Sequence, residues 1–154
     1  MTTPATAQPD PTPDVPTSPL VARTYGEPRF HAEGDIAAVA FAADGTLWSV
    51  DEAGVLRHWA DDGKLLKRTY LSDLETLWAF APGAARLASG NDDLLIWDVA
   101  DGQPLQRIEQ TTWVTALAFS PDGSTLASGH DDGTVRFWDT KAFKPVGQIK
   151  AHPK

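Results

Sequence analysis

The clearest hydrophobic pattern in this chain is a succession of short apolar runs that end in turn-forming sequences. Toward the C-terminus, VTALAF is followed by SPDG, TLAS is followed by GHDDG, and TVRFW and PVGQI come next. Short runs rich in β-branched and aromatic residues, bounded by Gly, Pro, Asp and Ser, are typical of β-strands joined by tight turns. No long stretch follows the period of a helix. The pattern therefore predicts an all-β fold.

The same pattern recurs along the chain. A phenylalanine returns every 39 residues in the strings IAAVAFAADG, ETLWAFAPGA and VTALAFSPDG, at Phe41, Phe80 and Phe119. A tryptophan returns after 38 and then 41 residues, at Trp59, Trp97 and Trp138. A fixed period of this length is the signature of a repeat architecture. Each unit reads as four short antiparallel strands, and the units span approximately residues 31–70, 71–110 and 111–150.

Four strands per unit of about 40 residues, closed by Trp-Asp, resemble the WD-repeat β-propeller family. The dipeptide stands at positions 97–98 and 138–139, whereas Trp59 is followed by Ala60. The third unit, TALAFSPDGSTLASGHDDGTVRFWD, matches the family pattern at nearly every landmark. The resemblance covers roughly residues 24–154. It implies a partial β-propeller of three four-stranded antiparallel blades.

The first 22 residues differ from the rest in composition. They mix Pro, Thr, Ala and Asp, with prolines at Pro4, Pro9, Pro11, Pro13, Pro16 and Pro19. Proline removes backbone hydrogen-bond donors, and few large apolar side chains are present to offset the entropy of ordering. We expect a disordered Pro-rich tail over residues 1–22, followed by the propeller segment over residues 23–154.

The resemblance also implies a hydrogen-bonded network inside each blade. Members of the family commonly hold a blade together with a buried set of His, Ser or Thr, Asp and Trp. The positions of this chain that match are Ser128, Asp132 and Trp138 in the third unit, Ser89 and Trp97 in the second, and Ser49 and Trp59 in the first. These residue types also suggest a hydrolase, but their recurrence in phase with the blades indicates a structural role.

The match to this network is incomplete. Gln110 stands in the segment leading into the third blade, where the family has His. In the second unit either Asp92 or Asp93 would serve as the acidic member, and in the first unit Ala53 replaces it. We therefore expect the first blade to be the least tightly specified of the three.

Three units are fewer than the 4–8 blades of a closed propeller, so two apolar faces would stay open. His152 resembles the residue that opens a further unit, and residues 23–31 resemble an outer strand before the first blade. Three interpretations follow. The chain is a truncated fragment, which is the preferred interpretation, or it self-associates through its open blade faces into a ring such as one of six blades, or it completes its ring with another protein.

Charge and composition narrow the function classes. The net charge is −8, with 21 acidic against 13 basic residues, and no basic stripe of the kind that contacts phosphates is visible. The chain contains no cysteine, which excludes disulfides and thiol chemistry. No apolar run is long enough for a membrane span, and the N-terminus does not resemble a signal peptide. We expect a cytoplasmic protein that binds neither nucleic acid nor membrane.

Candidate chemistry is sparse. The four histidines are His31, His58, His130 and His152, and none forms a pair at zinc-ligand spacing. The Asp-Asp-Gly sequences at 61–63 and 131–133 lack the further oxygen ligands of a calcium loop and indicate hairpin turns. No phosphate-binding loop is present. The sequence therefore predicts no catalytic residue, no metal and no cofactor.

The resemblance implies a non-catalytic protein–protein interaction scaffold with an unidentified protein or peptide partner. Trp113, at the entry to the third blade, is the main candidate for partner binding, because aromatic side chains are effective interface anchors; the alternative is that it packs against a neighbouring blade. His130, which we expect in an exposed turn, and Asp131 are weaker candidates. Two other functions remain open, a regulatory or sensor module of a larger multidomain protein and a propeller hydrolase.

Overall fold

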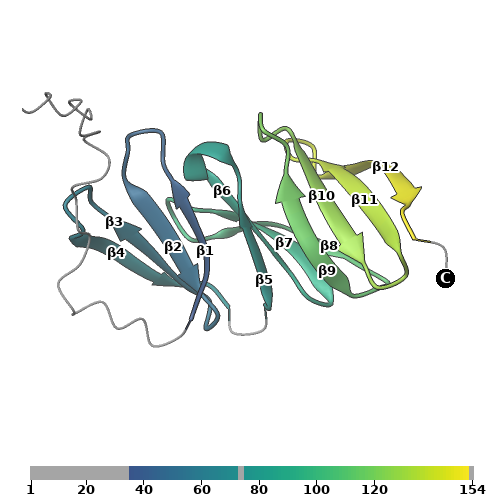
Figure 1. Cartoon of the computed structure of the whole chain (residues 1–154), viewed down its shortest axis with the longest axis horizontal. Coiled ribbons are helices and arrows are strands. Elements are labelled where there is room, and N and C mark those ends of the chain that lie inside the picture. Colours follow the sequence, from purple (N-terminus) through teal and green to yellow (C-terminus); the bar gives the residue numbers. More distant parts are fainter. Residues whose placement is uncertain (1–34, 73–74, 153–154) are drawn as a thin grey trace, which may run out of the picture.

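The computed structural model describes residues 35–72 and 75–152, and the predicted tail over residues 1–22 lies outside this part of the chain. The described residues form three four-stranded antiparallel sheets that follow one another in sequence order (Figure 1). This arrangement confirms the predicted all-β fold of three four-stranded blades. The part of the chain that the structure describes contains no helix long and apolar enough to cross a membrane.

Each sheet is a simple meander in which every strand pairs with the next one along the chain. The first sheet contains β1 (Ile36–Phe41), β2 (Leu47–Asp51), β3 (Val55–Trp59) and β4 (Leu65–Tyr70). The second contains β5 (Leu77–Phe80), β6 (Arg86–Gly90), β7 (Asp93–Asp98) and β8 (Pro104–Glu109), with the short 3-10 helix η1 (Pro82–Ala84) after β5. The third contains β9 (Val114–Phe119), β10 (Thr125–His130), β11 (Thr134–Asp139) and β12 (Lys144–Lys150).

The turn between the second and third strands of a sheet requires glycine in two of the sheets. Gly54 and Gly133 have φ angles of +70° and +81°, a region that side chains rarely adopt. The chain leaving the outer strand also runs against them: a Cβ on Gly133 would lie 2.4 Å from the His152 carbonyl oxygen. The Ala151 N–H donates to the Gly133 carbonyl at 3.0 Å, and Leu71 makes the same bond to Gly54 at 2.9 Å. Glycine thus lets the outer strand end against the hairpin turn.

The recurring aromatic residues occupy equivalent positions in the three sheets. In each sheet a phenylalanine, a leucine and a tryptophan are direct cross-strand partners, so all three side chains lie on one face. We call this the Phe–Leu–Trp face; it consists of Phe41, Leu47 and Trp59 in the first sheet, Phe80, Leu87 and Trp97 in the second, and Phe119, Leu126 and Trp138 in the third. A register shift also precedes the tryptophan in every sheet.

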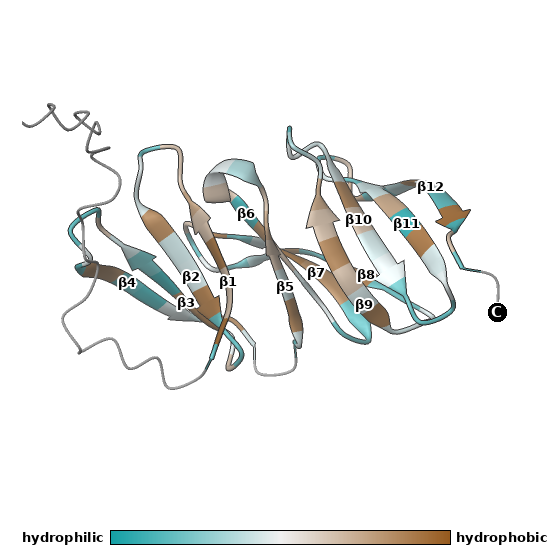
Figure 2. Cartoon of the chain, in the orientation of Figure 1, coloured by the Kyte–Doolittle hydropathy of each residue, from teal (hydrophilic) through white to brown (hydrophobic). Residues whose placement is uncertain are grey.

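Neighbouring sheets pack through these faces, each against the opposite face of the sheet before it. The Phe–Leu–Trp face of the second sheet shares one hydrophobic core with Trp48, Val50 and Leu56 of the first. The Phe–Leu–Trp face of the third sheet shares another core with Ala88, Leu94 and Ile96 of the second. Figure 2 shows hydrophobic stretches along β1, β5 and β9, where the sheets meet. The repeated residues thus form the contact between successive blades.

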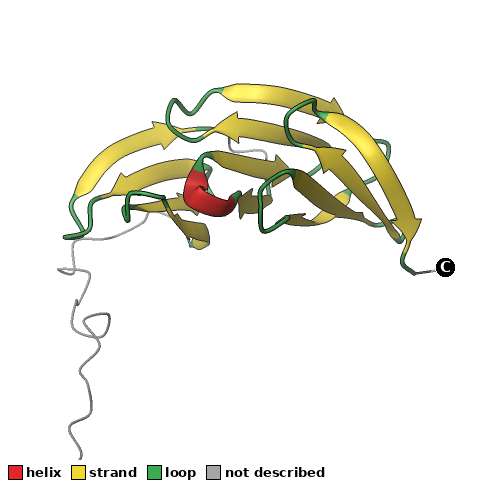
Figure 3. Cartoon of the chain, turned by 90° about the horizontal axis from the view of Figure 1, so that it is seen from above, coloured by secondary structure: helices red, strands yellow, loops and turns green. Residues whose placement is uncertain are grey.

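Two sheet faces remain open at the ends of the described chain. Seen from above, the three sheets follow an arc, with the first and third sheets at its ends (Figure 3). Phe41 is 66% exposed, whereas Phe80 and Phe119 at the equivalent positions are partly buried against a neighbouring sheet. At the other end Ile149 on β12 is 55% exposed. The three phenylalanines therefore share a register position but not the same degree of burial.

Candidate functional site

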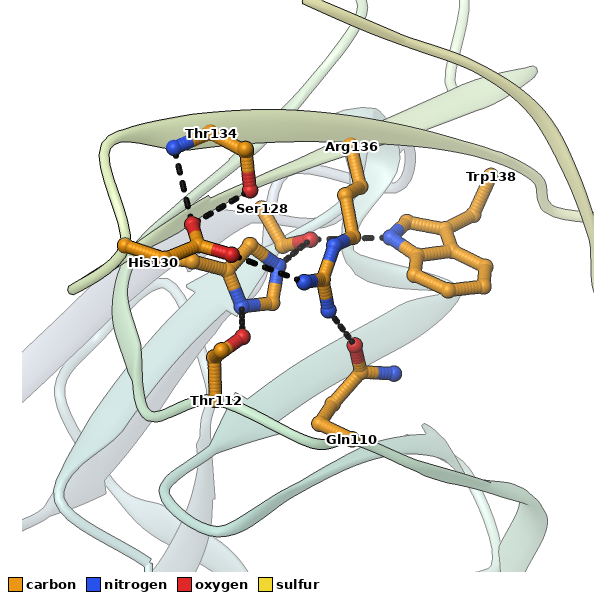
Figure 4. Close-up of polar contacts among 8 residues, drawn as sticks. Gln110, Thr112, Ser128, His130, Thr134, Arg136 and Trp138 are labelled. Carbon is orange, nitrogen blue, oxygen red and sulfur yellow. Dashed lines mark hydrogen bonds and ion pairs between the residues drawn. The ribbon is translucent and has the colours of Figure 1, made fainter. Parts of the chain in front are cut away.

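A buried hydrogen-bonded network links the central strands of the third blade to the segment before it (Figure 4). The Trp138 Nε1–H donates to Ser128 Oγ at 2.8 Å, and that oxygen lies 2.9 Å from His130 Nε2. His130 Nδ1 lies 3.1 Å from Thr112 Oγ1. Because an indole nitrogen only donates, the Ser128 hydroxyl hydrogen is available for Nε2. The network therefore favours a neutral imidazole that carries its proton on Nδ1.

The expectation that His130 lies in an exposed turn was wrong. Its side chain is only 5% exposed, because β10 continues through it and pairs with Val114 on β9. Residues two apart on a strand face the same way, so His130 points inward beside Ser128. It supplies the imidazole that we had looked for at Gln110, and both its ring nitrogens are engaged within the blade.

The surroundings of His130 disfavour its protonated form. Burial lowers the pKa of the imidazole below its ordinary value of 6.5, and the nearby positive charge of Arg136 lowers it further. A proton on Nε2 would also remove the acceptor that Ser128 uses. The blade is therefore held together by the neutral form of this histidine.

Acidification is expected to weaken the fold through His130. Since the pKa is lower in the folded chain than in the unfolded chain, the unfolded chain binds the proton first, and the free energy of unfolding decreases as the pH falls below 6.5. The slope from one such group is at most about 1.4 kcal/mol per pH unit. Urea denaturation between pH 7.5 and 5.5 measures this, and His130→Gln is expected to have a shallower dependence than the wild type.

The test compares the pH dependence of the free energy of unfolding between wild type and variant, because Glu75 changes this free energy with pH in the opposite direction. Burial raises the pKa of its carboxyl, so its contribution to stability improves on acidification. Parallel pH profiles for wild type and His130→Gln would refute the assignment of the acid sensitivity to His130.

Asp132, expected in the buried network, does not contact Ser128 or Trp138 in a hydrogen bond. Its Oδ1 instead accepts from the Thr134 N–H at 2.9 Å and from the Thr134 hydroxyl at 2.6 Å, which lowers the pKa of the Asp132 carboxyl. Its Oδ2 lies 3.2 Å from Arg136, whose guanidinium also donates to Gln110 Oε1 at 2.8 Å. Asp132 and Gln110 therefore both bind the Arg136 guanidinium, which lies beside the imidazole in Figure 4.

The serine–tryptophan pair recurs in the other two blades. The Trp97 Nε1–H donates to Ser89 Oγ at 2.8 Å, and the Trp59 Nε1–H donates to Ser49 Oγ at 2.8 Å. Two of these serines, Ser89 and Ser128, are fully buried, and Ser49 is nearly so. Six of the seven residues that the sequence placed in blade networks therefore form the three serine–tryptophan pairs. The seventh, Asp132, makes no hydrogen bond to the pair in its blade.

The second blade completes its network with a residue that we did not single out. Glu75 is buried just before β5, and a hydrogen bond with Ser89 partly counters the effect of burial on its pKa. Neither aspartate that we had considered fills this position. Asp93 accepts from Arg107 Nε at 2.6 Å, and this ion pair raises the pKa of the Arg107 guanidinium; Asp92 is exposed.

The first blade carries a buried ion pair that the sequence comparison missed. Asp51, two residues after Ser49, lies 2.6 Å through its Oδ2 from the Arg57 guanidinium, and its Oδ1 accepts the Val55 N–H at 2.9 Å. The acidic member is therefore Asp51, not a residue at position 53. Asp51 and His130 both stand two residues after the network serine, so strand alternation was the signal that would have identified them.

The most prominent aromatic side chain beside the third-blade network is Trp113. Its indole is 58% exposed, so packing against a neighbouring blade does not cover it. Its carbonyl accepts the N–H of Asp131, which is also exposed, at 3.1 Å. The structure therefore places these two candidate residues next to each other on the surface and places His130 underneath.

The described residues show no arrangement suited to metal chemistry. Within residues 35–72 and 75–152, no three side chains of the types His, Cys, Asp and Glu are grouped so that they could hold a metal ion. The buried polar groups of the third blade bond one another instead. What this arrangement can do is fix the blade and the loop that carries Trp113.

Comparison with known proteins identifies the repeat. Residues 102–139 match the WD40 family model, described as "WD domain, G-beta repeat". A search of curated proteins finds no match for the chain. Among solved structures, U3-55K matches with a TM-score of 0.64 and 21% identity over 79% of this chain and 41% of that one. The RRP9 WD40 repeats match with a TM-score of 0.63 and 20% identity over 79% and 40%.

The chain spans about two fifths of the length of these solved structures. At 20–21% identity these structural matches show a shared fold alone, and the family model matches residues 102–139. The serine–tryptophan bonds, the three meanders and the repeated sheet contacts agree with both findings. Residues 102–139 of the chain therefore match the WD40 repeat, within three sheets whose fold is similar to part of solved WD40 repeat proteins.

Proposed function

We propose that this chain is a non-catalytic scaffold that binds a protein or peptide through a surface centred on Trp113 and Asp131. The WD40 repeat fold is generally a protein-interaction scaffold. The observation that carries the proposal for this chain is an exposed indole on a rigid part of the backbone. Surface tryptophans of this kind are the residues most often found at the energetic centre of interfaces.

The backbone on both sides of Trp113 is fixed. The preceding residue, Thr112, is bonded to the buried ring of His130 at 3.1 Å. The following residue, Val114, is buried, and its N–H donates to the Asn91 carbonyl at 2.9 Å. A side chain held in this way loses little conformational freedom when a partner covers it, which favours affinity.

The chemistry of the surface indicates the kind of group it would bind. The indole offers a broad apolar face with an N–H at its edge, and the neighbouring Asp131 carboxylate accepts hydrogen bonds from a donor or a cation. A peptide that combines an apolar side chain with a basic one fits both. The net charge of −8 would favour the approach of such a peptide.

The partner-binding proposal predicts that Trp113→Ala weakens binding at least about tenfold, the effect of losing about 1.4 kcal/mol at an interface hot spot. Peptides are selected from a random library on the full chain, and their affinity for wild type and variant is measured by calorimetry. Leu105→Ala, at an exposed apolar position on β8, is the control and is expected to bind normally. Equal affinity for wild type and Trp113→Ala would contradict the proposal.

A second part of the proposal is self-association through the open faces of the first and third sheets. Exposed apolar patches on the surface of a folded protein commonly mark interaction sites. The exposed side chains of Phe41 at one end and Ile149 at the other support this part.

A further inference from the structure

The two open faces are the two halves of a contact that the chain already makes twice. Within the chain, a Phe–Leu–Trp face packs on the opposite face of the preceding sheet, once between the first and second sheets and once between the second and third. The first sheet leaves its Phe–Leu–Trp face uncovered, and the third sheet leaves its opposite face uncovered. Val135 and Phe137 on that face are half-buried, whereas Leu94 and Ile96 at the equivalent positions of the second sheet are fully buried. Each copy of the chain therefore presents both complementary faces of this contact, a Phe–Leu–Trp face on its first sheet and an opposite face on its third sheet.

The exposed Phe–Leu–Trp face of the first sheet keeps the shape of a docking surface. A hollow of about 270 Å³ lies between Phe41, Leu47 and Trp59, beside the turn that follows β3. Val39, on the same face, is also exposed. These side chains are the same three residue types that are covered by a neighbouring sheet in the second and third blades.

The opposite face of the third sheet matches its counterpart in the second sheet position by position. In the second sheet, the register pairs Ala88 with Ile96, Gly90 with Leu94, and Leu94 with Ile108. In the third sheet, the register pairs Ala127 with Phe137, Gly129 with Val135, and Val135 with Ile149. An alanine, a glycine and three large apolar residues thus recur at the same places.

The glycine in this set permits close approach. A Cβ on Gly90 would lie 2.9 Å from Val114 Cγ1 of the third sheet, so the absence of a side chain there lets the two sheets meet. Gly129 occupies the same register position on the open face. The apolar register rows of the two faces contain no charged side chain. The next row of the first-sheet face contains Arg57, which is already paired with the buried Asp51, and Arg68.

We propose that two copies of this chain associate head to tail, with the Phe–Leu–Trp face of one first sheet seated on the opposite face of the other third sheet. The inference rests on the proposed self-association and adds which face binds which. Two copies bring six blades, which lies within the 4–8 blades of closed propellers, so both contacts form in one ring. The assembly is a closed dimer with two identical contacts.

Sedimentation of the full chain at micromolar concentration tests this. The wild type is expected at twice the mass of one chain. Phe41→Asp and Phe137→Asp, which place a charge on either face, are each expected to raise the dimer dissociation constant about 100-fold or more. Leu105→Asp, on the middle sheet and away from both faces, is expected to stay dimeric.

Mixing the two variants distinguishes head-to-tail pairing from other modes. The intact first-sheet face of Phe137→Asp meets the intact third-sheet face of Phe41→Asp, so a 1:1 mixture is expected to yield a mixed dimer, detected with a mass tag on one variant. Circular dichroism checks that each variant keeps its β-structure. If either one unfolds, Val39→Asp and Ile149→Asp replace them on the same faces.

The outcomes separate the two ideas. A monomeric wild type overturns both self-association and the head-to-tail contact, and assigns the open faces to a different partner. A wild-type dimer that survives both substitutions, or variants that fail to pair when mixed, keeps self-association but overturns the head-to-tail contact.

Discussion

Replacing Trp138 with alanine is expected to lower the free energy of unfolding by about 3–5 kcal/mol, as large aromatic truncations in protein cores do. The side chain is only 8% exposed and shares a core with Leu126 of its own sheet and with Ala88 and Ile96 of the second sheet. The substitution therefore opens a cavity between two blades. It also removes the N–H that Ser128 accepts at 2.8 Å.

Two further variants separate these contributions. Trp138→Phe retains most of the packing and loses the donor, so it is expected to cost about 1 kcal/mol, because Ser128 keeps its contact with His130. Trp113→Ala removes an equally large side chain from the surface and is expected to change stability by less than about 0.5 kcal/mol. Urea denaturation followed by far-ultraviolet circular dichroism, at one protein concentration, measures all three. A cost below 1 kcal/mol for Trp138→Ala would show that the blades do not depend on this contact.

The repeat of three four-stranded sheets was the part of the fold that could be predicted from the sequence. Phe41, Phe80 and Phe119 stand in equivalent strings, and the structure places them at equivalent register positions. This works because the same short sheet needs the same inward residues each time it is built. The extent of burial could not be predicted from the repeat, since it depends on whether another sheet lies against the Phe–Leu–Trp face. The exposed Phe41 shows this.

The polar networks were harder to predict because the three blades place different residue types beside the recurring serine–tryptophan pair. Beside the recurring serine–tryptophan pair, the buried polar partner is His130 in the third blade, Glu75 in the second and Asp51 in the first. A search for one motif with fixed residue types finds the serine and tryptophan and misses the rest. In the first and third blades the buried polar partner stands two residues after the serine, and alternation along the strand is the evidence for it; Glu75 of the second blade precedes β5 and does not follow this pattern.

Removing the Asp51 carboxylate is expected to cost about 3–5 kcal/mol, the effect of breaking a buried ion pair from one side. Asp51 is fully buried and the Arg57 side chain is 7% exposed, with 2.6 Å between Oδ2 and the guanidinium. In Asp51→Ala the guanidinium keeps, among the residues that the structure describes, only the Val55 carbonyl, at 3.4 Å, as a hydrogen-bond partner. The Val55 N–H loses its acceptor as well.

A double variant tests whether the cost arises from the unpaired charge. Asp51→Leu combined with Arg57→Leu removes both charges and is expected to recover at least about 2 kcal/mol relative to Asp51→Ala, because apolar replacements of a buried pair are often close to neutral. The Val55 N–H, still without an acceptor, accounts for a remaining loss of about 1 kcal/mol.

Asp132→Ala is the matched control in the third blade, where the equivalent arginine, Arg136, also bonds Gln110 and the ion pair is partly exposed. Its expected cost is much smaller than that of Asp51→Ala, because solvent screens a partly exposed ion pair. Denaturant titrations of the four proteins give the comparison. If Asp51→Ala costs no more than Asp132→Ala, or if the double variant is no more stable than Asp51→Ala, the ion pair does not hold the first blade together. The first sheet would then depend on Trp48, Val50 and Leu56, the apolar residues it packs against the second.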